Sequence, residues 1–100
     1  MAESHLALTL KHRAMVQEMV EQVVPDARVW VFGSRATGHC RPFSDLDLLL
    51  DRPEHLTWRQ RASLIDAFEA SELPFRVDVV EAWELPSAMR ARIEHERQAL

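Results

Sequence analysis

Apolar residues recur along the chain with two different periods, and each change of period marks a predicted helix or strand. From about Ser4 to Val24 they repeat at helical spacing, and Pro25 should end this helix because proline supplies no N–H. Three short runs of apolar, β-branched or aromatic residues predict strands: Arg28–Phe32, Asp45 to about Asp51, and Phe75–Glu81.

Two further helices are predicted in the second half of the chain. Thr57 and Gln60 have the spacing of a capping box, so a helix should start there and end near Ser71. Its expected buried side is Trp58, Ala62, Ile65 and Phe68. After Pro86, the segment Ser87–Leu100 is expected to form a closing helix with a charged surface.

The resulting order is α-β-(α)-β-α-β-α, where the bracketed element is a short helix or loop between Gly33 and Ser44. Strands that alternate with helices predict an α/β fold, here a small mixed β-sheet covered by helices in a single domain over residues 1–100. The crossover of more than twenty residues between the second and third strands favours a parallel pair. The link between the first two strands is too short to fix their relative direction.

Composition excludes several classes of protein. The formal net charge of −4 argues against direct nucleic-acid binding through a basic surface. Cys40 is the sole cysteine, so neither an intramolecular disulfide nor a cysteine-based zinc cluster is expected. The N-terminus lacks the layout of a signal peptide and no apolar run approaches a membrane span, so we expect a cytoplasmic protein.

Acidic side chains fall at or within the predicted strands. Because strand side chains alternate between faces, Asp45 and Asp47 point the same way while the neighbouring leucines point into the core. Asp78 stands among valines and would join them if it lies on the same face of the sheet. Neighbouring carboxylates repel each other, and a divalent cation removes that repulsion. The pattern indicates a site for a metal-bound phosphate, with Asp78 also a candidate general base.

The turn after the first predicted strand suits a phosphate. Gly33 lets backbone N–H groups approach phosphate oxygens, and the Ser34 hydroxyl adds a donor. Arg35 is a candidate for neutralising phosphate charge, and a surface salt bridge explains it about as well. Taken singly, these features also have plain structural explanations: a simple turn, a solvated strand end at the Asp pair, and an exposed edge at Asp78.

Three motifs of the chain together resemble the minimal nucleotidyltransferases of the DNA polymerase β superfamily: Gly33-Ser34-Arg35-Ala36-Thr37-Gly38, Ser44-Asp45-Leu46-Asp47-Leu48 and Val77-Asp78-Val79-Val80. That family's signature is Gly-Ser, a spacer of about this length, Asp-x-Asp and a later strand Asp. The resemblance implies a nucleotidyltransferase fold and Mg²⁺-dependent transfer of a nucleoside monophosphate, usually AMP from ATP, to a hydroxyl. It implies Asp45, Asp47 and Asp78 as catalytic ligands of two Mg²⁺ ions. The nucleotide-binding residues would be Gly33, Ser34 and Arg35.

Small proteins of this kind are similar to the antitoxins of bacterial two-gene modules, whose partner is a helical HEPN-type toxin ribonuclease. In that family the antitoxin transfers AMP to a tyrosine of the toxin. This chain contains no tyrosine, so such a reaction would act in trans within a hetero-oligomer. Two alternatives stay open: a nucleotidyltransferase for a small molecule such as an aminoglycoside, and a non-catalytic nucleotide-binding antitoxin that acts by occlusion.

Overall fold

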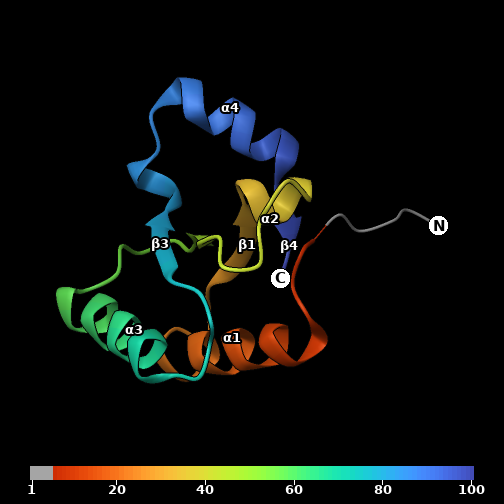
Figure 1. Ribbon diagram of the computed structural model, residues 1–100. Coiled ribbons are helices and arrows are strands. Elements are labelled where there is room, and N and C mark those ends of the chain that lie inside the picture. Colours follow the sequence, from red (N-terminus) through yellow and green to blue (C-terminus); the bar gives the residue numbers. More distant parts are fainter. Residues whose placement is uncertain (1–5) are drawn as a thin grey trace.

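Four strands pair into one mixed sheet in the computed structural model, which describes residues 6–100 (Figure 1). The strands are β1 (Arg28–Phe32), β2 (Leu46–Asp51), β3 (Val77–Glu81) and β4 (Gln98–Ala99), in the order β3-β2-β1-β4. The parallel pairing predicted for the second and third strands is confirmed, since β2 and β3 run parallel. The direction left undecided by the sequence is antiparallel between β1 and β2.

Helices cover both faces of this sheet. The chain forms α1 (Leu10–Val23), α2 (Ser34–Thr37), α3 (Trp58–Ala70), the 3-10 helix η1 (Ala82–Glu84) and α4 (Ser87–Glu96). Figure 1 shows α1 and α3 below the sheet and α4 above it. The predicted α/β class, with a mixed sheet between helices, is confirmed.

Two apolar clusters follow from the alternation of strand side chains. Leu46, Leu48 and Leu50 of β2 are fully buried against α1 and α3. Leu49 lies on the opposite face and packs with Ile93 of α4. Burial of β2 on both faces explains why its sequence is an almost continuous apolar run.

Both ends of the chain differ from the sequence prediction. The first helix begins at Leu10, because the Thr9 side chain accepts a hydrogen bond from the His12 N–H and caps it; Ser4 lies outside the described residues. The closing helix ends at Glu96 instead of continuing to Leu100. The residues after it form β4, which pairs with the exposed edge of β1 and satisfies main-chain groups there.

The middle helix was predicted with the correct start and end, and its predicted buried face is right for Phe68 but wrong for the other three residues. The Thr57–Gln60 capping box is present and Ser71 is the C-cap residue. The buried residues are Leu64 and Phe68, whereas Trp58 is 76% exposed and Ile65 38% exposed, and Ala62 is also exposed. Leu64 and Phe68 face inward because they pack in the core cluster with residues of α1 and β3. The third strand likewise starts at Val77, two residues later than predicted.

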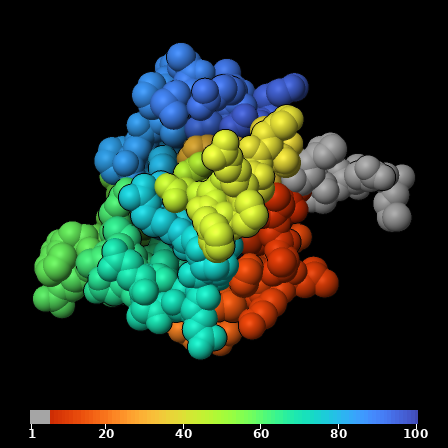
Figure 2. All heavy atoms as spheres, in the orientation of Figure 1, coloured from red at the N-terminus to blue at the C-terminus, as the bar shows by residue number. Residues whose placement is uncertain are grey.

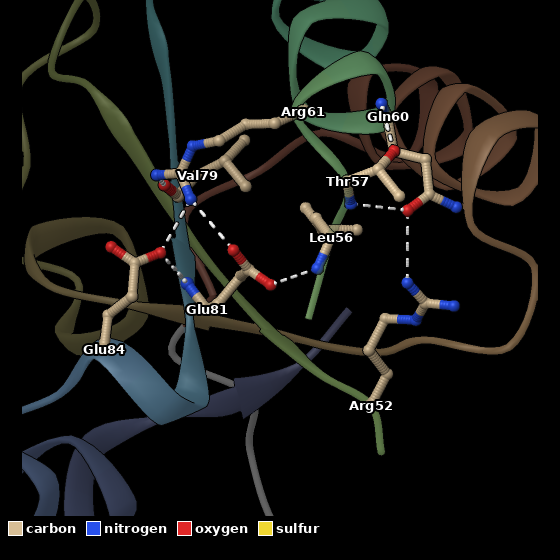
Figure 3. A network of polar contacts seen from close by, with 8 residues as sticks. All are labelled: Arg52, Leu56, Thr57, Gln60, Arg61, Val79, Glu81 and Glu84. Carbon is tan, nitrogen blue, oxygen red and sulfur yellow. Dashed lines mark hydrogen bonds and ion pairs between the residues drawn. The ribbon is translucent and has the colours of Figure 1, made fainter. Parts of the chain in front are cut away.

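A polar network around Glu81 fixes β3 against α3 (Figure 3). The Glu81 side chain is buried, and its carboxylate accepts hydrogen bonds from the Leu56 N–H at 2.6 Å and from Arg61 at 3.1 Å. Arg61 also donates to the Val79 carbonyl at 2.9 Å. Because a buried carboxylate is stable only when its oxygens are paired, this network holds the strand that carries Asp78 in place. Within residues 6–100, no helix has the length and apolar character needed to cross a membrane.

Candidate active site

The sheet brings the three predicted carboxylates to one region of the molecule. Asp47 of β2 lies beside Asp78 of β3 in the parallel register and opposite Phe32 of β1. Asp45 comes just before β2, at the end of the loop that follows α2. Figure 2 shows this loop, in yellow to yellow-green, lying on the surface against the start of β3, in cyan. The main-chain hydrogen bond from Leu46 to Arg76 joins the two segments.

Arg76 lies between two of these carboxylates. Its Nη2 is 3.1 Å from Asp45 Oδ2 and 3.2 Å from Asp78 Oδ2. The Arg76 side chain is 70% exposed, and the two acidic side chains are 44% and 42% exposed. The chain therefore places a positive charge of its own in the group of carboxylates.

Burial and the neighbouring carboxylates disfavour the ionised form of Asp47. Loss of hydration on burial, followed by repulsion from Asp78 and Asp45, raises the pKa of Asp47 from 3.8 to about 6. Arg76 opposes this change, and Glu96 adds to it. The positive charge of Arg76 therefore does not offset the combined effect of burial and the neighbouring carboxylates on Asp47.

The donor set fits Mg²⁺ in its chemistry. Magnesium is commonly bound through one or two carboxylates together with substrate phosphates, and these carboxylates share one side of the sheet. As they stand, no three His, Cys, Asp or Glu side chains among residues 6–100 are gathered as a metal cage. The Arg76 guanidinium lies between Asp45 and Asp78, within ion-pair distance of both carboxylates. The metal-ligand roles of the three carboxylates stay predictions.

The glycine turn packs directly against Asp47. Gly33 has φ 74° and ψ −154°, a backbone conformation that side-chain-bearing residues rarely adopt. A Cβ added at Gly33 would collide with Asp47 Oδ2. The Gly33 N–H donates to Glu96 Oε1 at 3.0 Å. Ser34 begins α2, and its hydroxyl donates to no other group within the described residues.

Arg35 holds the loop instead of lying at the carboxylates. It is 6% exposed, and its guanidinium donates to the carbonyls of Ser44, Ala7 and Pro42 at 3.0, 2.8 and 2.9 Å. Its Cζ also lies 4.1 Å from the centre of the Phe75 ring. The alternative of a surface salt bridge is wrong, because the side chain is buried on carbonyls. The structure shows the Arg35 guanidinium holding the loop that ends at Asp45, and its nucleotide-binding role stays a prediction.

Two residues at the site were missed by the sequence interpretation. Arg76 stands two positions before Asp78, and this spacing along a strand was a usable signal. Glu96 is the last residue of α4 and reaches Gly33 across 63 positions of sequence. Nothing in the sequence around Glu96 distinguishes it from the other charged residues of that helix.

A Gly33→Ala substitution is expected to damage the site more than the fold. The strained backbone should reduce the free energy of unfolding by about 2 kcal/mol, and the new methyl group should displace the Asp47 carboxylate. Gly38→Ala is the matched control, since Gly38 also has a positive φ, 82°, at the end of α2. Urea denaturation together with calorimetric titration of ATP and Mg²⁺ should show binding lost in Gly33→Ala and kept in Gly38→Ala. Equal binding by the two variants would contradict this expectation.

Comparison with known proteins places these features in a family. The sequence model of the nucleotidyltransferase domain matches residues 12–100. The probable protein adenylyltransferase MntA of Haemophilus influenzae is 40% identical over 78 residues, which are 78% of this chain and 68% of that protein. A solved structure described as a minimal nucleotidyltransferase is 37% identical with a TM-score of 0.70, covering 88% of this chain and 91% of that chain.

A toxin–antitoxin crystal structure with AMP-PNP shares the fold. Its TM-score is 0.71 at 20% identity, over 86% of this chain and 69% of that chain. A second toxin–antitoxin structure, MntA–HpeT with a Y104A substitution, also has a TM-score of 0.71 at 20% identity, over 88% of this chain and 70% of that chain. The nucleotidyltransferase fold expected from the sequence motifs is confirmed.

Proposed function

Because this chain belongs to the nucleotidyltransferase domain family, we propose that it is an antitoxin that transfers AMP from ATP to a tyrosine hydroxyl of a HEPN-type toxin ribonuclease in the cytoplasm. The description of its Haemophilus relative as a probable protein adenylyltransferase supports a protein acceptor. The toxin–antitoxin structures with the same fold agree with a toxin as the partner.

The observation that carries the proposal is the position of Asp47, between Asp78 of the next strand and the Gly33 turn. Asp45, Asp47 and Asp78 would hold two Mg²⁺ ions, which when bound neutralise phosphate charge and favour ionisation of the acceptor hydroxyl. Gly33 and Ser34 would bind the triphosphate through N–H and hydroxyl donors. Asp78, being part-exposed, is accessible to the acceptor as a general base.

In the proposed transfer, the acceptor oxygen forms a bond to the α-phosphorus of ATP. The bond from that phosphorus to the bridging oxygen of the β-phosphate breaks, and pyrophosphate leaves. The hydroxyl proton passes to the Asp78 carboxylate. The products are the adenylylated acceptor and pyrophosphate.

Features of this chain favour an acceptor on another protein. The chain has no tyrosine, so a tyrosine acceptor must come from a partner. A cavity of about 390 Å³ between α3 and β3 includes Arg76 and Asp78 in its lining, so the proposed general base is reached from this cavity. AMP on a tyrosine near a ribonuclease active site would block RNA by bulk and by charge repulsion.

The test is transfer of label from ATP to the protein encoded by the neighbouring gene. With α-labelled ATP and Mg²⁺, the wild-type chain should label that protein on tyrosine, and EDTA should prevent it. Asp45→Asn should lose the reaction, whereas Asp51→Asn, an exposed position at the end of β2, should keep it. Absence of labelling by the wild-type chain, or full labelling by Asp45→Asn, would reject the proposal.

The two alternatives give different results in the same system. A nucleotidyltransferase for small molecules would label a compound such as an aminoglycoside and leave the neighbour unlabelled. An antitoxin that acts by occlusion alone would neutralise the toxin equally well with Asp45→Asn.

A further inference from the structure

Arg76 lies where the proposed function needs a metal ion. The exposed guanidinium bridges Asp45 and Asp78 through one nitrogen, at 3.1 and 3.2 Å. Both carboxylates belong to the proposed metal site, and among the described residues no three His, Cys, Asp or Glu side chains are gathered as a metal cage. A cation that takes oxygens from both residues must therefore displace the guanidinium.

Glu96 lies where the proposed function needs a phosphate. Its Oε1 accepts from the Gly33 N–H at 3.0 Å, so one main-chain donor of the glycine turn is already used. The contact is part-buried and comes from the end of α4, on the other side of Asp47 from β3. An anionic oxygen that accepts from this N–H must displace the Glu96 carboxylate.

We propose that Arg76 and Glu96 are internal competitors for the substrates: before substrate binds, Arg76 substitutes for the metal ion and Glu96 for a phosphate oxygen, and binding releases both. The inference rests on the proposed function, because it assumes that these carboxylates bind metal and that this turn binds phosphate. It explains two contacts for which the transfer reaction itself has no use. Arg76 balances part of the negative charge, and Glu96 satisfies an N–H that is part-buried.

The first test measures Mn²⁺ affinity by electron paramagnetic resonance, without nucleotide or partner. Arg76→Gln should bind Mn²⁺ about threefold to tenfold more tightly than wild type, the range expected when two exposed ion pairs no longer compete. Arg92→Gln is the control, because it removes one positive charge from an exposed position of α4. Its Mn²⁺ affinity should change by less than about twofold. Unchanged or weaker Mn²⁺ binding in Arg76→Gln would overturn the proposal.

The second test measures the affinity for α,β-methylene-ATP with Mg²⁺ by calorimetry. Glu96→Ala should bind this analogue about threefold to tenfold more tightly, since the Gly33 N–H loses its internal acceptor and a nearby negative charge is removed. Glu96→Gln keeps an oxygen that can accept the same hydrogen bond, so its affinity for the analogue should increase less. Because this substitution is conservative, it also serves as a second variant if Glu96→Ala does not fold. Glu94→Ala is the control for charge. Unchanged or weaker binding in both Glu96 variants would overturn the proposal.

These measurements separate the inference from the proposed function. Tighter Mn²⁺ and nucleotide binding by the variants, with no labelling of any partner by wild type, would support internal competition and reject the antitoxin reaction. Labelling of the partner by the wild-type chain, with unchanged Mn²⁺ and nucleotide affinities in the variants, would support the antitoxin reaction and reject internal competition.

Discussion

An Asp47→Asn variant is expected to lose AMP transfer by at least about a thousandfold and yet to be harder to unfold than the wild-type chain at pH 8. The loss of activity is expected because Asp47 lies between Asp78 and the glycine turn, the position proposed for a metal ligand. The gain in stability follows from the pKa of Asp47, which burial and the neighbouring carboxylates raise to about 6.

The direction of the pH dependence is set by proton binding. Between pH 3.8 and about 6 the folded chain holds a proton on Asp47 that the unfolded chain releases. Stability from this residue is therefore greatest below pH 3.8 and is lost as the pH rises through about 6. The full shift corresponds to about 3 kcal/mol, and solvent screening of this half-buried group reduces the expected gain for Asp47→Asn to about 1 kcal/mol at pH 8.

Urea denaturation at pH 8 and pH 4 in EDTA, together with the labelling assay, checks both parts of this prediction. The stability difference between Asp47→Asn and wild type should be present at pH 8 and nearly absent at pH 4. Asp51→Asn should match wild type in transfer, since Asp51 is exposed at the far end of the same strand. A variant that is less stable than wild type at pH 8, or one that retains transfer, would show that Asp47 has a different role.

Replacing Arg35 by Met is expected to reduce the free energy of unfolding by about 4 kcal/mol, the largest stability effect among the variants considered. Met fills much of the same volume but leaves the carbonyls of Ser44, Ala7 and Pro42 without their donor. Hydrogen bonds to a charged group contribute about 1.5–3 kcal/mol each, and the loss of three is only partly additive. Arg35→Lys should lose about half as much, since an ammonium keeps the charge but cannot reproduce the planar fork.

The same Arg35 substitutions should weaken the active site through the loop that ends at Asp45. Arg41→Met, an exposed arginine in that loop, is the matched control and should change stability by less than about 0.5 kcal/mol. Denaturation and Mn²⁺ titration of the three variants give the comparison. If Arg35→Met were as stable as Arg41→Met, the three hydrogen bonds would carry no net stability. If Arg35→Lys bound Mn²⁺ like wild type, the loop would not depend on the guanidinium.

The sequence was informative where a property depends on neighbouring residues. The limits of β1 were predicted to the residue, because proline and glycine bound an apolar, β-branched run. The capping box that starts α3 was also predicted, since Thr57 and Gln60 interact across a single helical turn. The buried face of α3 was predicted correctly only at Phe68. Several apolar residues lie around the helix, and only its packing against α1 and β3 places Leu64 inside.

By itself, the sequence determined the α/β class, the alternation that separates Asp47 from the core leucines, and the glycine turn, because each follows from local periodicity or backbone freedom. Only the tertiary structure decided that β1 and β2 run antiparallel and that the chain ends in a strand beside β1. It also decided that Arg76 bridges Asp45 across 31 positions and that Glu96 meets Gly33 across 63. Such contacts join segments brought together by strand pairing and packing, so no local pattern in the sequence specifies them.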